Sequence, residues 1–296
     1  MENKIKLLVT GANGQLGSEL KHLAANYPDF EFLFTDVAEL DITKPGQAEK
    51  FVAENPVSFI INCAAYTAVD KAEEDHDKAF LINAIAVDYL IDAARASGAT
   101  LIHVSTDYVF DGTKNSPYHE EDVAIPESAY GQTKYEGENL ILYSDIPAII
   151  IRTSWLYSTF GNNFVKTMLR LGVEKEAINV VYDQVGTPTY ARNLAQAILE
   201  IISQVSREPI KSREIYHYTN EGVASWYDFA SEIFRHRNLS CTVHPIDTSK
   251  YPTAAKRPAF SVLSKDKIKR EFNLAIPHWV DSLHQMLRDL DGEKQH

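Results

Sequence analysis

The segment LLVTGANGQLGSEL places three glycines between an apolar run and an amphipathic run, and this junction constrains the fold more than any other feature of the chain. Gly11 permits a tight turn, Gly14 lets backbone N–H groups approach a phosphate, and Gly17 lets the following helix pack closely on the strand. The start of that helix would add free N–H donors and a partial positive charge. The spacing predicts a dinucleotide-binding turn, with an ordinary glycine-rich turn as the alternative.

The first half of the chain alternates short apolar runs with longer amphipathic ones. Several of the apolar runs are continuous in Val, Ile, Leu and Phe, as in strands that are covered on both faces of a parallel sheet. This order predicts an α/β fold with a Rossmann-type, doubly wound parallel sheet. The expected strands are 4–10, 30–35, 57–64, 100–106 and 148–153, and the expected helices lie near 14–26, 45–54, 76–97 and 129–143.

The alternation loosens after about residue 153. There we expect helices near 161–173, 190–206, 225–237 and 277–291, and short strands at 178–182, 214–219 and 242–246. We therefore expect an NAD(P)-binding domain over residues 1–154, to which the chain returns around 178–206. A smaller C-terminal, substrate-binding domain is expected to take up most of residues 155–296.

The composition of the chain argues against several classes of binding partner. The net charge of −12 argues against nucleic acid, which proteins bind mainly through basic surface. No stretch approaches the roughly 18 apolar residues of a membrane span, and the N-terminus lacks the pattern of a signal peptide. We therefore expect no membrane partner and, by default, a cytoplasmic location. Cys63 and Cys241 are too few for a disulfide framework or a cysteine metal cage.

Asp36 indicates which dinucleotide would bind. It follows the second expected strand, 19 residues beyond Gly17, where an acid commonly binds the hydroxyls of the adenosine ribose. A carboxylate there would repel a 2′-phosphate, so the residues favour NADH or tolerance of both NADH and NADPH. A solvated aspartate at a strand end is the alternative. The other residues expected around the cofactor are Asn13, Gln15, Leu16, Asp41, Ile42, Ala64, Ala65 and Tyr66.

Tyr130 and Lys134 stand four residues apart in AYGQTKYEGE, so they project from the same face of the expected helix. This spacing alone is expected about once by chance in such a chain. A tyrosine can exchange a proton with a substrate if its pKa is brought nearer the operating pH. A neighbouring ammonium favours the phenolate, so Lys134 is expected to lower the pKa of Tyr130.

A series of segments resembles one known family. They occur in the order TGANGQLG, NCAAYTAVDKAE, STDYVFDG, YGQTK, RTSWLY, GNNFVKTMLR, DQVGTPT and AAKRPAFSVL, over about residues 5–290. Together they resemble the dTDP-4-dehydrorhamnose reductases of the extended short-chain dehydrogenase/reductase superfamily. The resemblance implies an oxidoreductase that uses NADPH or NADH to reduce the C4 ketone of dTDP-4-dehydro-L-rhamnose to dTDP-L-rhamnose.

The resemblance also assigns roles to the residues. It makes Tyr130, Lys134 and Thr106 catalytic, with Lys134 bound to the nicotinamide ribose and Thr106 holding the substrate carbonyl. In STDY, Tyr108 follows Asp107 where the related 4,6-dehydratases carry an Asp–Glu pair. Dehydration would lack its base here, so simple carbonyl reduction is favoured.

The substrate, a dTDP-linked 4-keto-deoxy sugar, would need local cations for its diphosphate. Arg257 is our first choice, with a surface salt bridge as the alternative. Trp155 matches a sugar-facing aromatic of the family, although it would also suit a core, and Gln184 lies in a loop where it would reach the nucleobase. The full set expected around the substrate is Thr67, Thr106, Asp107, Trp155, Asn163, Lys166, Gln184 and Arg257.

One departure from the family concerns a metal. Some members hold a divalent metal at a dimer interface through acidic residues, but Arg192 occupies one of those places here and leaves Glu19 alone. We therefore expect no metal, and a monomer or weak homodimer. Two other functions stay open: a reductase of another nucleotide-linked 4-keto-deoxyhexose, and a non-catalytic NADP-binding regulatory subunit. The intact set of Tyr130, Lys134 and Thr106 argues against the second.

Overall fold

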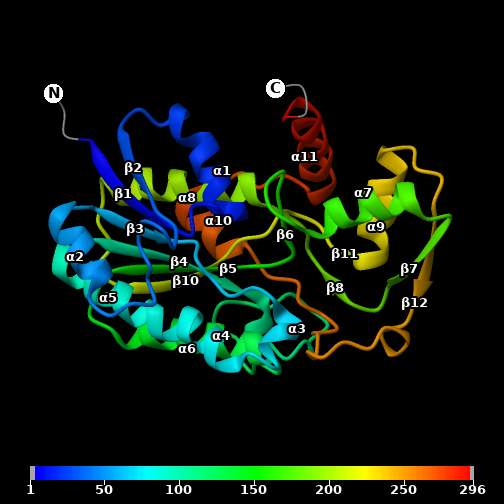
Figure 1. Cartoon of the computed structure of the whole chain (residues 1–296), viewed down its shortest axis with the longest axis horizontal. Helices are drawn as coiled ribbons and strands as arrows, with labels where there is room; N and C mark the ends of the chain where they lie inside the picture. Colours follow the sequence, from blue (N-terminus) through cyan, green and yellow to red (C-terminus); the bar gives the residue numbers. More distant parts are fainter. Residues whose placement is uncertain (1–3, 294–296) are drawn as a thin grey trace.

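The computed structural model describes residues 4–293; residues 1–3 and 294–296, at the outer ends of the two expected domains, lie outside the described part. A six-stranded sheet with helices on both faces forms the larger part of the molecule, and a smaller group of helices and short strands lies beside it (Figure 1). Within the described residues, no helix is both long and apolar enough to cross a membrane.

The large sheet is parallel throughout, in the order β10-β5-β4-β3-β1-β2. The prediction of a Rossmann-type, doubly wound fold is therefore confirmed. Its strands are β1 (Ile5–Thr10), β2 (Phe30–Phe34), β3 (Phe59–Asn62), β4 (Thr100–Thr106), β5 (Ala148–Thr153) and β10 (Arg213–His217).

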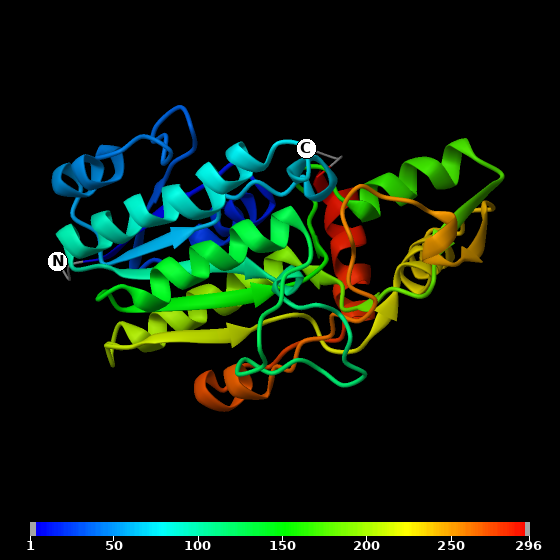
Figure 2. The same cartoon turned by 90° about the horizontal axis from the view of Figure 1, so that it is seen from below.

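Side chains of successive residues enter opposite layers of helices, because they alternate across a strand. Leu7 and Val9 of β1 pack on one face, against α1 (Gln15–Leu23), α8 (Ala191–Val205) and α10 (Asp266–Phe272). Leu8 packs on the other face, which Figure 2 shows in front, covered by α2 (Gln47–Glu54), α5 (Ala86–Ser97) and α6 (Ala129–Tyr143). Burial on both faces explains the continuous apolar runs.

The expected helix 76–97 is interrupted in the structure. After α3 (Val69–Ala72), α4 (His76–Phe80) leads through a π-helical turn (Leu81–Ile85) into α5. The turn places Asn83 in the interior, where its side chain bonds both backbone groups of Tyr66 and the hydroxyl of Thr133. These bonds fix the segment after β3 against α6.

The smaller part has its own core, built largely from aromatic and long aliphatic side chains. It contains α7 (Phe164–Glu174), β7 (Ala177–Val181), α9 (Trp226–His236), β12 (Thr242–Ile246) and α11 (Trp279–Glu293). Three two-stranded pairings hold it together: β7 with β12, β8 (Val185–Gly186) with β11 (Ala224–Ser225), and β6 (Leu156–Tyr157) with β9 (Thr189–Tyr190).

The return of the chain to the large sheet differs from the expected range of 178–206. β7, at the start of that range, pairs with β12 outside the sheet, whereas α8 packs on the sheet. β10, which we expected in the smaller part, is the sixth strand of the sheet and pairs with β5. An edge strand has one neighbour and is partly exposed, so the sequence REIYH lacks the apolar run that marks the inner strands.

Candidate active site

The expected site residues gather at the carboxyl ends of the parallel strands. β1 lies between β2 and β3, so the connections on its two sides run in opposite directions across the sheet. Ligands of open α/β sheets bind in the crevice at such a switch point. The glycine loop follows β1 there, and Thr106 ends β4.

The glycine loop fits a pyrophosphate. Gly11 has a φ of +63°, and a Cβ at this position would lie 2.7 Å from the Cα of Ala64. At Gly17 a Cβ would lie 2.5 Å from the Cα of Ala12, so helix and strand pack as closely as the sequence predicted. Gly14 is the N-cap of α1 and no side chain caps this helix start, which leaves N–H donors for a phosphate. These residues therefore suit a dinucleotide at this edge of the sheet.

Asp36 is held by the glycine loop itself. Its carboxylate accepts a hydrogen bond from the backbone N–H of Asn13 at 2.9 Å. A cation lies beside this pair: Nζ of Lys21 is 3.5 Å from Oδ1 of Asn13 and 5.5 Å from the ring centroid of Phe34. Lys21, which comes from α1, was not among the residues predicted from the sequence. The sequence feature that could have identified Lys21 is its position one helical turn after Gly17, on the side of α1 that faces Phe34 of β2.

The other residues expected around the cofactor surround the same loop. Gln15 bonds the carbonyl of Leu156, Asp41 accepts from Thr43, and Tyr66 donates its backbone N–H to Asn83. Leu16 and Ile42 are buried in the two sheet cores, so their side chains support the loop rather than face a ligand. Ala64 and Ala65 are half-buried at the end of β3.

Tyr130 lies in the first turn of α6. Ser128 caps this helix by accepting from the N–H of Gly131 at 3.1 Å, and Glu73 accepts from the N–H of Ala129 at 2.9 Å. Two groups surround the phenol: Tyr108, whose ring meets that of Tyr130 edge-on at 5.6 Å, and the hydroxyl of Thr106, which hydrogen-bonds it.

The pKa of Tyr130 is raised, contrary to the expected lowering by Lys134. Burial is the largest cause, and the hydrogen bond with Thr106 only partly opposes it. Lys134 is not among the groups that shift this pKa. A raised pKa keeps the phenol protonated, which suits a proton donor.

Lys134 is buried below Tyr130. Its Nζ donates to the carbonyl oxygen of Val104 at 2.7 Å and lies 3.2 Å from Nε2 of His103. Burial lowers the pKa of Lys134 to about 8. The sequence analysis did not single out His103, although LIHVST places a polar residue in the middle of an otherwise apolar strand.

Asp107 is buried directly after β4. The Thr106 hydroxyl donates to its Oδ1 at 3.1 Å. Burial raises the pKa of Asp107 to about 6, and hydrogen bonds from its neighbours partly oppose the rise.

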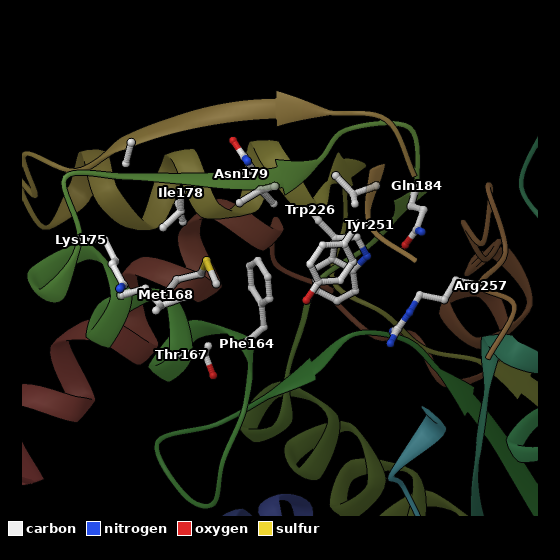
Figure 3. Close-up of a pocket in the computed structure, with 14 residues that line it drawn as sticks. Phe164, Thr167, Met168, Lys175, Ile178, Asn179, Gln184, Trp226, Tyr251 and Arg257 are labelled. Carbon is white, nitrogen blue, oxygen red and sulfur yellow. The ribbon is translucent and has the colours of Figure 1, made fainter. Parts of the chain in front are cut away.

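A cavity of about 510 Å³ opens in the smaller part (Figure 3). Figure 3 shows Gln184 and Arg257 at one end and Lys175 at the other, with the rings of Trp226 and Tyr251 between them. The sequence analysis predicted Gln184 and Arg257 as substrate contacts. It missed the apolar and aromatic lining, because these side chains come from segments far apart in the chain: Phe164, Met168, Ile178, Val181, Trp226 and Tyr251.

Arg257 connects this cavity with the Tyr130 region. Its Nη2 is 2.6 Å from Oδ2 of Asp70, and its Nη1 is 3.4 Å from the hydroxyl of Tyr108. Asp70 also accepts from the backbone N–H of Ala255 at 3.2 Å. The role of Asp70 was missed, although it lies in the VDKAE segment just beyond β3.

The remaining expected substrate residues are not part of the cavity lining. Trp155 has a φ of +48° and stacks on Trp226 at 3.6 Å. Asn163 caps α7 and donates to Oε1 of Gln15 at 3.1 Å, which ties the substrate-side helix to the glycine loop. Lys166 donates to the carbonyl of Gly161, and Thr67 is exposed. Asn163 and Lys166 are thus not brought to the cavity.

Arg192 bridges two acids at the place discussed for a metal. Its guanidinium lies 2.8 Å from Glu19 of α1 and 2.7 Å from Asp289 of α11. Within residues 4–293, no three His, Cys, Asp or Glu side chains are grouped to hold a metal ion. The network joins the large sheet layer to the last helix.

The fold and these residues define a class: a Rossmann-type NAD(P)H oxidoreductase, with a dinucleotide loop, a buried Tyr–Lys–Thr set and an adjoining cavity. Residues 5–291 match the family model "RmlD substrate binding domain", and the chain belongs to this family.

Proteins similar to this chain include three dTDP-4-dehydrorhamnose reductases. It is 42% identical to a dTDP-4-dehydrorhamnose reductase of Aggregatibacter actinomycetemcomitans, over 94% of this chain and 97% of the relative. A crystal structure of such a reductase from Clostridium acetobutylicum is similar with a TM-score of 0.91 and 44% identity, covering 97% of this chain and all of the other. One from Bacillus anthracis, in complex with NADP, has the same TM-score at 39% identity, covering 97% and 99%.

Proposed function

We propose that this protein reduces the C4 ketone of dTDP-4-dehydro-L-rhamnose to dTDP-L-rhamnose, with NADPH or NADH as reductant. The observation that carries the proposal is the continuous line of groups from the cavity to the phenol. Arg257 lines the cavity and reaches Tyr108, and Tyr108 packs edge-on against Tyr130. A nucleotide sugar lying along this line would place its sugar ring beside Tyr130.

The side chains divide the reaction between them. The bound cofactor supplies the hydride for C4. Tyr130 donates its proton to the carbonyl oxygen, so that one C–H bond and one O–H bond form in the same step. Its raised pKa keeps that proton in place until the substrate arrives. The hydroxyl of Thr106 hydrogen-bonds Tyr130 and orients the phenol toward the ketone.

The cavity and Arg257 would hold the nucleotide. Its volume of about 510 Å³ lies within the range of small-molecule sites, and its aromatic lining suits a flat base. The guanidinium of Arg257 is the group placed between the cavity and Tyr108, so it would meet the diphosphate in a charge-assisted hydrogen bond. Asp70 holds that guanidinium at 2.6 Å, so the diphosphate would compete with or share this partner.

Lys21 supports the use of NADPH. A 2′-phosphate beside Asp36 alone would be repelled, but the ammonium of Lys21 lies next to Asn13 and offsets that repulsion. The residues around the ribose therefore suit either cofactor.

The cytoplasmic location and the monomeric or weakly dimeric state remain predictions from the sequence.

The decisive experiment is Tyr130→Phe, with Tyr143→Phe as the matched control on the same helix. Tyr143 is 89% exposed, so its hydroxyl is not expected to matter. Removing the Tyr130 hydroxyl takes away the proton donor, and we expect kcat to fall by about 10²- to 10⁴-fold while cofactor affinity changes little. Turnover is followed as loss of NADPH absorbance with the keto-sugar. A Tyr130→Phe enzyme with near-normal kcat would refute the proposed role.

The same assay separates the other functions. A regulatory subunit would bind NADP without consuming NADPH with any keto-sugar. A reductase of another 4-keto-deoxyhexose would show a higher kcat/KM for that sugar than for dTDP-4-dehydro-L-rhamnose. The buried Tyr130 and Lys134 beside Thr106 favour catalysis over binding alone.

A further inference from the structure

Lys134 ends a chain of buried hydrogen-bonding groups that crosses the sheet. Its Nζ is 3.2 Å from Nε2 of His103 on β4, and Nδ1 of the same ring is 3.1 Å from Nδ2 of Asn62 on β3. Oδ1 of Asn62 accepts from the hydroxyl of Thr10 at 2.8 Å and from the backbone N–H of Ala64 at 3.2 Å. The side chains of Asn62, His103 and Lys134 are at most 1% exposed, so water does not replace these partners.

Donors and acceptors along this chain can be assigned one by one. The backbone N–H of Ala64 only donates, so it requires the oxygen of the Asn62 amide on its side. The NH₂ group of Asn62 then faces His103, and because NH₂ only donates, Nδ1 of His103 must accept. A neutral imidazole that accepts at Nδ1 carries its hydrogen on Nε2. That hydrogen points at Nζ of Lys134.

An ammonium group has three hydrogens and no lone pair, so it cannot accept this hydrogen. A neutral amine can. The contact between His103 and Lys134 is therefore a hydrogen bond when Lys134 is an amine and a donor–donor contact when it is an ammonium. We propose that His103, with its ring hydrogen fixed on Nε2 by Asn62, is a positioning residue that makes Lys134 easier to deprotonate.

The ionisable groups on the other sides of Lys134 do not replace this effect. Glu138 raises the pKa of Lys134, but its carboxylate is itself paired with Arg152 of β5 at 2.6 Å. The pKa of His103 is well below its usual range because of burial and the nearby Lys134, which agrees with a neutral ring. Glu73 accepts from the backbone N–H of Ala129 at the start of α6, and Asp107 and Tyr108 act on the phenol of Tyr130.

The proposal predicts the pH above which the enzyme loses activity, its alkaline limit. This consequence rests on the proposed function. A charged Lys134 would make charge-assisted hydrogen bonds to the nicotinamide ribose, the role that the resemblance to the family implies for it. Loss of that charge then ends activity on the alkaline side, at a pH that His103 and Asn62 have lowered. Only one proton moves: the N–H bond of the ammonium breaks, the proton passes to water, and the amine gains the hydrogen bond from Nε2.

Asn62→Asp tests the proposal, because this isosteric change would exchange the donor and acceptor roles of the two ring nitrogens of His103. One carboxylate oxygen would still accept from Thr10 and Ala64, and the other would accept from Nδ1–H of His103. Nε2 would then become an acceptor for the ammonium. We expect the alkaline limb of the profile of kcat/KM against pH to move up by about one pH unit or more. Thr10→Val is the matched control, because Ala64 still sets the amide of Asn62, and this variant should keep the wild-type limb.

Nitrogen-15 NMR of the imidazole rings gives a readout that does not depend on activity, and the wild-type spectrum tests the proposal even if Asn62→Asp does not fold. His103→Gln identifies the resonances of His103 among those of the 10 histidines. We expect the hydrogen on Nε2 in the wild-type protein and in Thr10→Val, and on Nδ1 in Asn62→Asp. A wild-type ring with its hydrogen on Nδ1 overturns the proposal, as does a folded Asn62→Asp enzyme with an unmoved alkaline limb. If Tyr130→Phe remained active, the proposed function would fail while the ring assignment stood.

Discussion

The glycine loop and the cavity of the smaller part are two candidate binding regions that are built in different ways. The loop consists of consecutive residues, and backbone atoms set its geometry, as the 2.5 Å approach of a Cβ at Gly17 to Ala12 shows. The cavity is lined by side chains from α7, β7, the start of α9 and the segment 251–257. The first region is encoded locally, and the second exists only when the smaller part has assembled.

This difference predicts how each region responds to substitution. A backbone-built site fails when any bulk is added, because neighbouring backbone cannot move aside. A site built from side chains loses affinity in increments, since each contact contributes separately. Arg257 is the exception in the cavity, because it contacts Asp70 and Tyr108 of the sheet part and so links the two regions.

Among the substitutions that compare these two regions, Gly17→Ala is expected to have the largest effect, because it changes both stability and cofactor affinity. The new methyl would lie 2.5 Å from backbone atoms of Ala12 and Gly11, so helix α1 must shift, at a cost of about 1–3 kcal/mol in the free energy of unfolding. The shift also moves the phosphate-binding N–H groups, so NADPH affinity should fall by about tenfold or more. Gly292→Ala is the control, because a Cβ there meets nothing within 4 Å. Equal stability and equal NADPH affinity in Gly17→Ala and Gly292→Ala would contradict the idea that backbone atoms set the geometry of the glycine loop.

Next in size is Arg257→Gln, which tests the side-chain-built region. Loss of a charge-assisted hydrogen bond of about 1.5–3 kcal/mol should raise KM for the nucleotide sugar by about 10- to 100-fold. The Kd for NADPH, measured by fluorescence quenching, should stay within about twofold because the glycine loop is untouched. Arg270→Gln, an exposed arginine of α10, serves as control. A change in the Kd for NADPH without a change in KM for the nucleotide sugar would contradict the proposed contact between Arg257 and the substrate.

Lys21→Gln is expected to have a smaller and selective effect. An exposed cation beside a phosphate contributes about 0.5–1 kcal/mol, so kcat/KM with NADPH should fall by about two- to fivefold. With NADH, which has no 2′-phosphate, it should hardly change. Steady-state kinetics with both cofactors on one keto-sugar measures the ratio. Equal losses with the two cofactors would contradict a contact with the 2′-phosphate.

Acid stability also differs between the large sheet and the smaller part. His103 and His217 are fully buried in the large sheet with pKa values well below the usual range, chiefly because of burial. The histidines of the smaller part that the structure describes are half-buried or exposed. A depressed histidine pKa means that the unfolded chain binds protons first as the pH falls below about 6.5.

Each such histidine therefore removes up to about 1.4 kcal/mol of stability per pH unit below that value. Hydrogen exchange should show protection of the sheet falling between pH 7 and pH 5. His217→Gln should show a shallower fall in the free energy of unfolding from urea titrations than the wild type does. A wild-type protein whose stability is unchanged over this range would contradict the prediction.

The inner strands were predictable because they are buried on both faces, which leaves an unmistakable apolar run in the sequence. β10 was misplaced because an edge strand carries a weaker pattern, and α10 was missed because its seven residues span about two turns. Tyr130 and Lys134 were predictable from spacing and resemblance. Trp226, Phe164 and Asp70 were not, because no local pattern distinguishes a cavity-lining aromatic from a core aromatic.

The sequence by itself determined the parallel sheet, the glycine loop and the helix that presents Tyr130 above Lys134. These depend on hydrophobic periodicity and backbone conformation, which act between residues close in the chain. Tertiary structure alone decided that burial raises the pKa of Tyr130, that Lys21 lies beside the Asn13 that Asp36 binds, and that Asn62 and His103 lead to Lys134 through hydrogen-bonding contacts. Such effects depend on which side chains exclude water from one another, and that is settled when distant segments pack.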